Sequence, residues 1–578
     1  MDRKQLKKQH ISQLILLLLI VALINFIGSI WYLRIDLTEE NRHSLSDTSI
    51  EVLKDLDDIM YVKVYLEAEE LPVDLLRLQR KIREMLNDFR RYSPEIEYEF
   101  INPFEVKDRE IQYKIYKQLE EKGLIPTELQ EGGPESSRKQ LVFPGALLSY
   151  KGNEYPVNFL ENEGIGGSDK KINKSISRVE QKFVQGMMRL VNPEVKKIAF
   201  IEGHGELDEY QTMDMMISLS EYYKIERLSI NGVLGALDDY EAVVMAKPTQ
   251  RVSEKDKFIL DQYIMNGGKV LWLIEWMGMS MDSLSNQPSS MALIRDINMD
   301  DILFNYGVRI NPDLIQDLNC LSIPITVNQR SGEPQFEPRQ WYFFPAVSSE
   351  NNHIINKTVS IIRTQFVSSI DTVGEDDNIN KTYLLKTSPY SRTLGVPVEV
   401  SLDMLRRPPL PRLFNEGKQP IAVLLEGRFE SNFDGRIPLE FVKNKDIGFK
   451  PESKHTSQIV ISDGDMIRNY VHQRGERKEP LQLGADRYYS QQFTPGNKEF
   501  LMNAVNYLCG DEALIKLRMR EIKLRLLDKG KVREQGVFWS VFNTVVPVII
   551  IVLLGVILIL VRKFRYSKNV NLTQNEKE

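Results

Sequence analysis

Residues 197–206 read Lys-Ile-Ala-Phe-Ile-Glu-Gly-His-Gly-Glu, an apolar run that leads into a loop with two glycines. A run that is apolar almost throughout is typical of a strand in a parallel sheet that is buried on both faces. Strands and helices then alternate, with predicted strands at 225–230, 242–246 and 270–274 and predicted helices at 211–222 and 254–265. This alternation predicts a doubly wound α/β domain, which we place at residues 193–510.

The preceding segment, 34–192, has a different order of elements. Its predicted elements are strands at 61–66 and 96–101, helices at 75–89 and 109–122, a hairpin over 141–160 and a helix over 170–191. The order β-α-β-α-β-β-α resembles a thioredoxin fold. Neither cysteine of the chain falls in this segment, so the redox Cys-x-x-Cys pair is absent. We interpret it as a thioredoxin-like binding or packing domain without oxidoreductase activity.

The C-terminal half of the α/β segment is less regular. Strand-like runs lie at 396–401, 420–425 and 458–462, and loops rich in Pro, Asn and Asp lie at 328–340, 371–380 and 404–418. A helix is predicted at 498–509, and a basic juxtamembrane stem follows at 511–538. Within the stem, apolar and basic residues alternate from 515 to Met519, so a strand and a membrane-surface segment both fit. We favour a solvated stem.

Two uncharged stretches of 23 residues, Ile11–Leu33 and Trp539–Val561, lie near the ends of the chain. About 20 apolar residues in a helix cross the hydrocarbon core of a bilayer. The first stretch could instead be a cleaved signal peptide, but its apolar run is long and no clear Ala-x-Ala site follows. We therefore predict two transmembrane helices, the first an uncleaved anchor.

Basic residues flank both stretches on the terminal side. The tails 1–10 and 562–578 each carry a net charge of +3. Positively charged flanks stay in the cytoplasm, so both termini are predicted to lie inside a bacterial inner membrane. Residues 34–538 then form a large periplasmic domain, and with a net charge of −6 for the whole chain this domain carries −12.

The composition excludes several classes of protein. The net charge of −6 over 578 residues argues against a general nucleic-acid binder, which is usually basic. Two cysteines, Cys320 and Cys509, cannot form a disulfide framework, and whether they pair stays open. No P-loop, G-x-S-x-G or H-E-x-x-H motif occurs, so the chain lacks those ATPase, hydrolase and zincin signatures. We predict no cofactor and no metal.

The loop after the first α/β strand holds the candidate site, with Glu202, His204 and Glu206. Open α/β sheets place ligands at the carboxyl ends of their strands. A histidine between two carboxylates could hold a metal or move a proton, but the spacing matches no standard metal set. We favour a structural turn, with a ligand or partner surface as the second interpretation. Asp463 and Asp465 are interpreted as a capped turn before a helix at 466–471.

Several segments together resemble the auxiliary-component family of bacterial ABC-type transport systems. They are 197–206, 239–244, 247–249, 267–271, 387–389, 422–427 and 459–463. The likeness is strongest to the gliding-motility-associated members, which implies a GldF-like membrane subunit, a separate GldA-like ATPase and contact with membrane lipid. The family's α/β part is similar to class I glutamine amidotransferases and to a domain of an intraflagellar transport protein. The amidotransferase nucleophile is a cysteine on a strand-to-helix elbow, which this sequence lacks.

The resemblance implies a non-catalytic accessory membrane subunit, with no catalytic residues carried over. One alternative is a periplasmic module, anchored in the inner membrane, that binds peptidoglycan or sugar. Another is an enzyme of unknown reaction that uses Glu202, His204 and Glu206. Substrate, transport direction, stoichiometry and self-association stay open.

Overall fold

The computed structural model describes residues 12, 15–23, 44–68, 71–105, 108–131, 138–160, 168–192, 194–330, 333–349, 352–357, 359–374, 378–407, 409–445, 447–475, 477–484, 496–519 and 529–574. The chain divides into a compact unit, Met1–Glu521, and a second unit, Ile522–Glu578. The compact unit is a mixed α/β structure with two main sheets.

The N-terminal part of the compact unit is built on a four-stranded sheet. Its elements are α2 (Asp47–Lys54), β1 (Met60–Val64), α3 (Val73–Tyr92), β2 (Ile96–Phe100), α4 (Arg109–Glu121), β3 (Thr127–Glu131), β4 (Arg138–Val142), β5 (Gly145–Tyr150), β6 (Asn153–Asn158), α5 (Ser168–Ser177) and α6 (Val179–Val191). The strand order is β2-β1-β5-β6. β1 and β2 are parallel, and the other neighbours are antiparallel.

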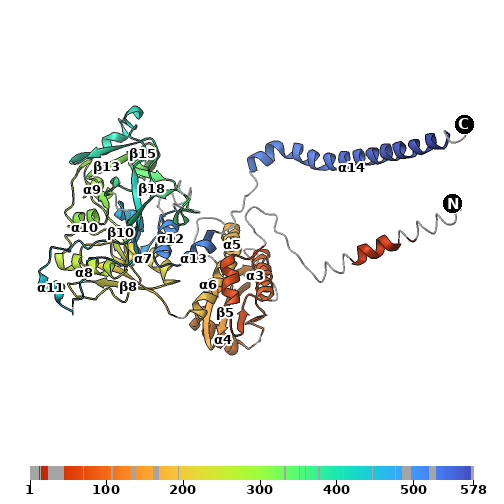
Figure 1. Ribbon diagram of the computed structural model, residues 1–578, viewed down its shortest axis with the longest axis horizontal. Helices are drawn as coiled ribbons and strands as arrows, with labels where there is room; N and C mark the ends of the chain where they lie inside the picture. Colours follow the sequence, from red (N-terminus) through yellow and green to blue (C-terminus); the bar gives the residue numbers. More distant parts are fainter. Residues whose placement is uncertain are drawn as a thin grey trace. The chain divides into compact units, whose positions relative to one another are not determined.

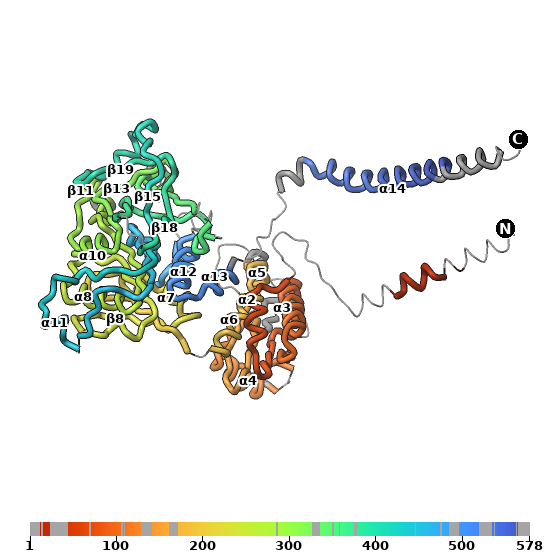
Figure 2. The backbone as a smooth tube through the Cα atoms, viewed as in Figure 1, coloured from red at the N-terminus to blue at the C-terminus, as the bar shows by residue number. Residues whose placement is uncertain are grey.

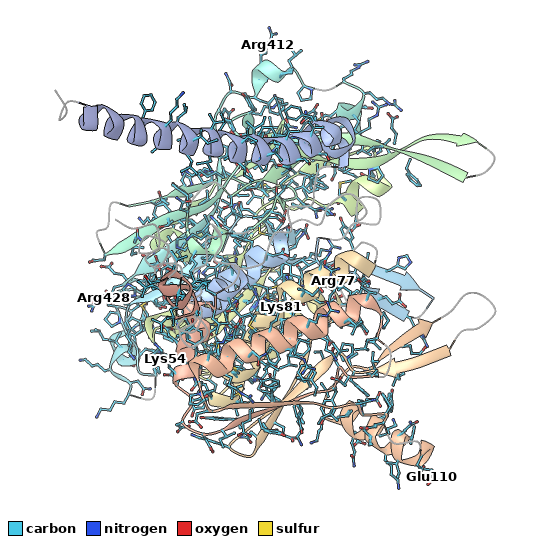
Figure 3. All side chains as sticks on the ribbon, turned by 90° about the vertical axis from the view of Figure 1, so that its right-hand side faces the viewer. Lys54, Arg77, Lys81, Glu110, Arg412 and Arg428 are labelled. Carbon is cyan, nitrogen blue, oxygen red and sulfur yellow. The ribbon has the colours of Figure 1, made fainter. Side chains whose placement is uncertain are left out.

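Local sequence explains most of these elements. The buried side of α3 repeats at helical spacing, with Leu78, Ile82 and Phe89 fully buried. Figure 3 shows Arg77 and Lys81 one turn apart on the same helix. The β5–β6 hairpin turns at Lys151 and Gly152, which both have positive φ, as a two-residue turn with the twist of the strands requires.

Two features of this part differ from the sequence predictions. The single helix expected over 170–191 is two helices, α5 and α6, because Arg178 leaves helical geometry with φ −98° and ψ 2°. The pair β3–β4 is an additional hairpin that the periodicity did not indicate. The polar sequences of these two strands explain the omission, since neither shows a clean alternation of apolar and polar residues.

The second sheet has seven strands in the order β18-β21-β22-β10-β9-β7-β8. Figure 1 labels β18, β10 and β8 of this sheet. Its strands and helices are β7 (Lys197–Glu202), α7 (Glu209–Ser220), β8 (Lys224–Ser229), β9 (Ala242–Ala246), α8 (Glu254–Met265), β10 (Lys269–Leu273), β18 (Ile379–Lys386), β21 (Pro420–Gly427), β22 (Thr456–Ile461) and α12 (Asn497–Leu508). Five neighbouring strands, from β22 to β8, are parallel, while β21 and β18 are antiparallel.

Each face of this sheet is covered by its own apolar core. Phe200, Val244 and Leu271 point to the face that packs against α7 and α12. Val243 and Trp272, on the opposite face, pack against α8. Because successive side chains of a strand alternate between faces, burial on both faces requires the near-continuous apolar runs that the sequence shows.

Apart from one long hairpin, the remaining elements of the compact unit are short, and most lie between β10 and β22 in the sequence. They are α9 (Met281–Asn286), β11 (Ser289–Ala292), α10 (Asp300–Asn305), β12 (Val308–Ile310), β13 (Asp313–Asp317), β14 (Cys320–Arg330), β15 (Glu333–Val347), η1 (Ile354–Asn356), β16 (Ile362–Arg363), β17 (Ile370–Thr372), β19 (Ser391–Gly395), β20 (Val398–Ser401), η2 (Leu402–Leu405), η3 (Pro411–Leu413), α11 (Leu439–Lys443), η4 (Gly464–Ile467), β23 (Val471–Arg474), β24 (Arg477–Pro480) and α13 (Glu512–Met519).

Three sequence predictions in this region are wrong. The loop expected at 328–340 lies largely in the long hairpin β14–β15. The helix expected at 466–471 is replaced by the 3₁₀ turn η4, which ends at Ile467. The basic stem expected from residue 511 begins instead with a helix, α13, because Ile515 and Leu517 are buried against the compact unit. Burial of these apolar side chains favours the helix over the solvated segment.

The second unit contains α14 (Lys529–Gln574), which runs as one helix through the apolar segment despite Pro547 (Figure 2). Within it, Phe538–Val561 is long and apolar enough to cross a membrane, with a mean hydropathy of 3.3. Among the described residues this is the one helix of that kind. Of the first predicted span, residues 12 and 15–23 are helical, and the other residues of that prediction lie outside the described ones.

Candidate functional site

The candidate loop lies where the order of the parallel strands reverses. β7 is the first strand of the sheet, and the chain adds β8 on one side of it and β9 on the other. In open α/β sheets this reversal leaves a crevice at the carboxyl ends of the strands, where ligands bind. Glu202 ends β7, and His204 and Glu206 follow it, so the sequence prediction placed these residues at the correct edge.

His204 is buried and joins two carboxylates. Its Nδ1 lies 3.0 Å from Oε1 of Glu206, and its Nε2 lies 3.1 Å from Oδ2 of Asp256. The backbone N–H of His204 also donates to Oε2 of Glu206, at 2.7 Å. Asp256 lies in the first turn of α8, so the imidazole connects the loop after β7 to that helix. The sequence indicated Glu206 as a partner but gave no indication of Asp256, which is 52 residues away.

Asp256 extends this network to a third loop. Its Oδ1 accepts from the backbone N–H of Gly232, at 2.7 Å, in the loop after β8. Its Oδ2 also accepts from the hydroxyl of Ser253, at 2.9 Å, the N-cap residue of α8. The loops after β7 and β8 and the start of α8 are thus held by a single carboxylate. A satisfied buried network of this kind makes the edge of the sheet rigid.

Glu202 does not join the histidine. Its Oε1 accepts from Nε of Arg227, in the neighbouring strand β8. Arg227 also donates to the backbone carbonyl of Leu207, at 2.8 Å. The three predicted residues therefore separate into a strand-to-strand ion pair and a histidine network, and the structure does not bring them together as one reactive group.

The two glycines of the loop both have positive φ, +113° at Gly203 and +75° at Gly205. The resulting turn exposes the carbonyl of His204, which accepts from the backbone N–H groups of Thr249 and Gln250 at 2.9 and 2.7 Å. The hydroxyl of Thr249 donates to the carbonyl of Gly205, at 2.7 Å. These bonds tie the loop after β7 to the loop after β9, as a structural turn requires.

Opposing effects act on the pKa of His204. Burial alone would lower it, but the hydrogen bonds to Glu206 and Asp256 outweigh burial and raise the pKa above its usual value near 6.5. For Asp256, burial raises the pKa, and the hydrogen bonds from His204, Gly232 and Ser253 outweigh it and lower the pKa. Both shifts stabilise the charged imidazolium between the two carboxylates relative to the neutral ring.

We expect the stability that His204 provides to depend on pH. Because the pKa of His204 is higher in the folded chain than in the unfolded chain, its protonation stabilises the fold. This stability is fully present below the unfolded pKa of about 6.5 and is lost as the pH rises through the folded pKa. His204→Ala should therefore lower the free energy of unfolding by about 1–2 kcal/mol near pH 6 and by less at pH 9. Denaturant titration of the full-length chain in detergent, followed by tryptophan fluorescence, measures this difference.

The matched control is His455→Ala, because His455 is exposed. This variant should unfold as the wild type does at both pH values. If His204→Ala had the same effect at pH 6 and pH 9, the imidazolium network would not stabilise the fold.

A second charged cluster lies at the same edge of the sheet, after β9, β10 and β22. Lys247 directly follows β9, Glu275 follows β10, and Asp463 and Asp465 follow β22. All four are buried. Nζ of Lys247 lies 2.6 Å from Oδ2 of Asp465 and 3.9 Å from Oε2 of Glu275. Asp463 accepts from the backbone N–H groups of Gln365 and Asp465, at 3.0 and 2.9 Å.

The cluster holds one lysine among three carboxylates, and burial shifts their pKa values. Burial raises the pKa of Asp463 to about 7, with the charge of Asp465 acting in the same direction. Burial also raises the pKa of Glu275 well above its usual value. For Lys247, burial lowers the pKa, but the charges of Glu275 and Asp465 outweigh this effect, so the pKa of Lys247 is raised.

The predicted capping by Asp463 is confirmed, although Asp463 caps η4 instead of an α-helix.

Sequence reasoning missed Lys247 and Glu275 as members of this cluster. The available signal was their position, since both are charged residues at the carboxyl end of an apolar parallel strand.

Close packing also shapes the cluster. A Cβ on Gly464 would lie 2.6 Å from Cγ of Lys247 and 3.0 Å from Cβ of Glu275. The side chains of Lys247 and Glu275 are thus packed closely around Gly464.

Cysteine and metal chemistry find no support in the described part of the chain. Cys320 and Cys509 are both free thiols. Burial raises the pKa of each to about 12, so neither is a ready thiolate nucleophile at neutral pH. Among the described residues, no group of three or more His, Cys, Asp or Glu is placed to hold a metal ion.

Comparisons with known proteins concern both parts of the compact unit. A domain family of unknown function matches residues 39–149, and a search of curated proteins finds no match. Among solved structures, the mmIFT52 N-terminal domain is similar with 15% identity and a TM-score of 0.30, over 54% of this chain and 97% of that chain. The family model described as ABC-type uncharacterized transport system matches residues 195–504, more than half of the chain. The chain therefore belongs to the ABC-type uncharacterized transport system family.

Proposed function

We propose that this chain is a non-catalytic accessory subunit of an ABC-type membrane transport complex. The observation that carries the proposal is the family match over residues 195–504, which includes the candidate loop and the buried Lys247 cluster. The apolar helix Phe538–Val561 supports attachment to a membrane. The hydrogen-bonded state of His204 also supports a structural role for the loop, because both ring nitrogens have carboxylate partners.

Within this role, we propose that the chain corresponds to the gliding-motility component GldG. It would work with a membrane subunit resembling GldF, and a separate ATPase resembling GldA would supply the energy. The absence of a P-loop motif from the sequence supports dependence on another subunit for ATP hydrolysis.

We also propose fold relationships for the two parts of the compact unit. The strand order β2-β1-β5-β6, with one parallel and two antiparallel pairs, supports a thioredoxin-like domain at 34–192. The parallel strands from β22 to β8, covered on both faces, support an amidotransferase-like domain at 193–510. The loop directly after β7, residues 203–208, includes no cysteine, which supports the fold without amidotransferase activity.

For the membrane arrangement, we propose two spans in a bacterial inner membrane with both termini in the cytoplasm. The net charge of +3 on each tail supports this orientation. Residues 34–538 would then be periplasmic, and the basic residues between α13 and the apolar helix would lie near lipid headgroups.

The test is purification of the tagged full-length chain from its native membrane in mild detergent. We expect a membrane subunit and an ATPase to copurify in fixed stoichiometry, as identified by mass spectrometry, and ATP hydrolysis to require the ATPase subunit. A cysteine replacing Lys568, in a background without Cys320 and Cys509, should be protected from an impermeant thiol reagent added outside.

The control is the same chain truncated before Lys529, which lacks α14. If the subunits associate through the membrane, this form should lose them. Purification of the full-length chain without any ABC-type subunit, but with peptidoglycan fragments, would contradict the proposal and favour an envelope-binding module.

A further inference from the structure

The two parts of the compact unit, one built on the four-stranded sheet and one on the seven-stranded sheet, have separate apolar cores. The buried apolar residues of the N-terminal part form one cluster, and those on the two faces of the seven-stranded sheet form two others, which begin at Ile198. Among the described residues, the buried members of the N-terminal cluster all precede residue 191, with the exception of Leu517. One side chain of α13 therefore completes the core of the N-terminal part.

The start of α13 is held by the other part, the one built on the seven-stranded sheet. α13 follows α12 after Gly510, which has a φ of +72°. Oδ1 of Asp511 accepts from Nζ of Lys196 at 2.8 Å, and its Oδ2 accepts from the hydroxyl of Tyr223 at 2.9 Å. The helix thus begins on one part of the compact unit and inserts Leu517, in its last turn, into the core of the other.

A second contact between the two parts centres on Tyr222, which follows α7. Its carbonyl accepts from Nη1 of Arg189 at 2.9 Å, and its hydroxyl accepts from Nε2 of Gln181 at 3.4 Å, both from α6. The guanidinium of Arg518, in α13, lies 5.1 Å from the centre of the Tyr222 ring, within the range of a cation–π contact. α13 therefore also contacts the residue through which α6 meets the seven-stranded part.

The two parts leave a cavity of about 610 Å³ between them. Its walls come from β6, α5 and α6 on one side and from α7 and α12 on the other, and Arg518 of α13 lies in the wall. Polar interfaces between parts of one chain permit relative motion unless they are large and apolar. Ser218, in α7, lines this cavity and is 9% exposed, so its accessibility depends on how closely the two parts lie.

α13 is a helix only because it is docked. It has eight residues, and isolated helices of that length are marginal in water. Ile515 and Leu517 are buried, whereas the side chain of Lys516 between them is 59% exposed. Residues 520–528 alone separate α13 from α14, so the C-terminal attachment of the compact unit runs through this short helix.

We propose that α13 is a releasable clasp: when its last turn leaves the N-terminal core, the two parts separate and the cavity between them opens. Burial of Leu517 and the contact of Arg518 with Tyr222 hold the closed arrangement. Because the chain continues from this helix to α14, a displacement of α14 acts on the clasp before it acts on either sheet. The accessory-subunit role does not require a clasp, so either proposal can fail without the other.

The reactivity of a cysteine in the cavity wall tests the proposal. Ser218→Cys is introduced into the full-length chain in a background with Cys320→Ser and Cys509→Ala. The rate of its reaction with a bulky maleimide is measured in detergent micelles. In the closed arrangement this reaction should be slow, because the side chain at position 218 lies in a partly enclosed wall.

Variants of α13 should then change this rate. Leu517→Glu places a carboxylate in an apolar core, so it should release the helix and raise the rate by about tenfold or more. Leu517→Ala removes part of the buried surface without adding a charge and should raise the rate about threefold. Lys516→Gln is the matched control, because it changes the net charge by the same amount as Leu517→Glu at an exposed position of the same helix. It should leave the rate unchanged.

A second cysteine distinguishes release of the clasp from unfolding of the N-terminal part. Ala146 is fully buried in the core that Leu517 completes, so Ala146→Cys should stay unreactive in both Leu517 variants. The proposal would be overturned if neither Leu517 variant raised the rate at position 218 above that of Lys516→Gln. It would also be overturned if the cysteine at position 146 became as reactive as the one at position 218, since Leu517 would then be an ordinary part of the N-terminal core.

Discussion

Replacing Lys247 with methionine should lower the free energy of unfolding by about 3–5 kcal/mol, the cost of removing one partner from a buried ion pair. The ammonium lies 2.6 Å from Asp465 and within 4 Å of Glu275, and all of these groups are buried. Methionine fills similar space but removes the nearer cation of Asp465, which keeps only Arg468, at 3.5 Å. Denaturant unfolding of the full-length chain in detergent, at neutral pH, measures the loss.

A control and a rescue separate this effect from a general loss of charge. Lys224 forms an ion pair with Glu226 at 2.7 Å, but its side chain is 60% exposed. Lys224→Met should therefore cost at most about 1 kcal/mol. Asp465→Asn in the Lys247→Met background should recover part of the loss, since an amide carries no charge to be buried. Equal losses for Lys247→Met and Lys224→Met would show that the buried cluster does not stabilise the fold.

The central sheet could be predicted because its strands are buried on both faces. The strands β7, β9 and β10 therefore show as runs of apolar residues, and turn residues mark where they end. The hairpin β14–β15 could not be recognised in the same way. It contains prolines and many polar residues, so no period of two distinguishes it from a loop. At α13, the alternation of basic and apolar residues fits a strand or a membrane-surface segment, and the sequence favours a solvated stem, but burial of Ile515 and Leu517 selects a helix.

The candidate site was predicted in its position but not in its composition. A loop with two glycines after a parallel strand is a local signal, and it led directly to His204 and Glu206. The second carboxylate, Asp256, comes from a helix that the topology alone brings to this edge. The Lys247–Asp465 pair joins residues 218 positions apart. Contacts at such separations depend on strand order, and one sequence without its fold does not give that order.

Gly205→Val should be about as damaging as Lys247→Met, at about 2–6 kcal/mol. Gly205 has a φ of +75°, where a β-branched residue is strained by roughly 1–3 kcal/mol. A Cβ at this position would also lie 2.2 Å from Oγ1 of Thr249, so the loop after β9 must move, at a cost of about another 1–3 kcal/mol. Thermal and denaturant unfolding of the full-length chain should rank this variant well below His204→Ala in stability.

The two costs can be separated with alanine at the two glycines of the loop. A Cβ on Gly203 meets nothing closer than 3.9 Å, so Gly203→Ala is destabilised by its backbone alone, at φ +113°. Thr249→Ala removes the oxygen that Gly205→Ala would strike. The double variant of Gly205 and Thr249 should therefore be more stable than the sum of the single changes predicts, while Gly203 and Thr249 should be additive. If the losses of stability were additive in both double variants, close packing between the loops after β7 and β9 would not explain the need for glycine at position 205.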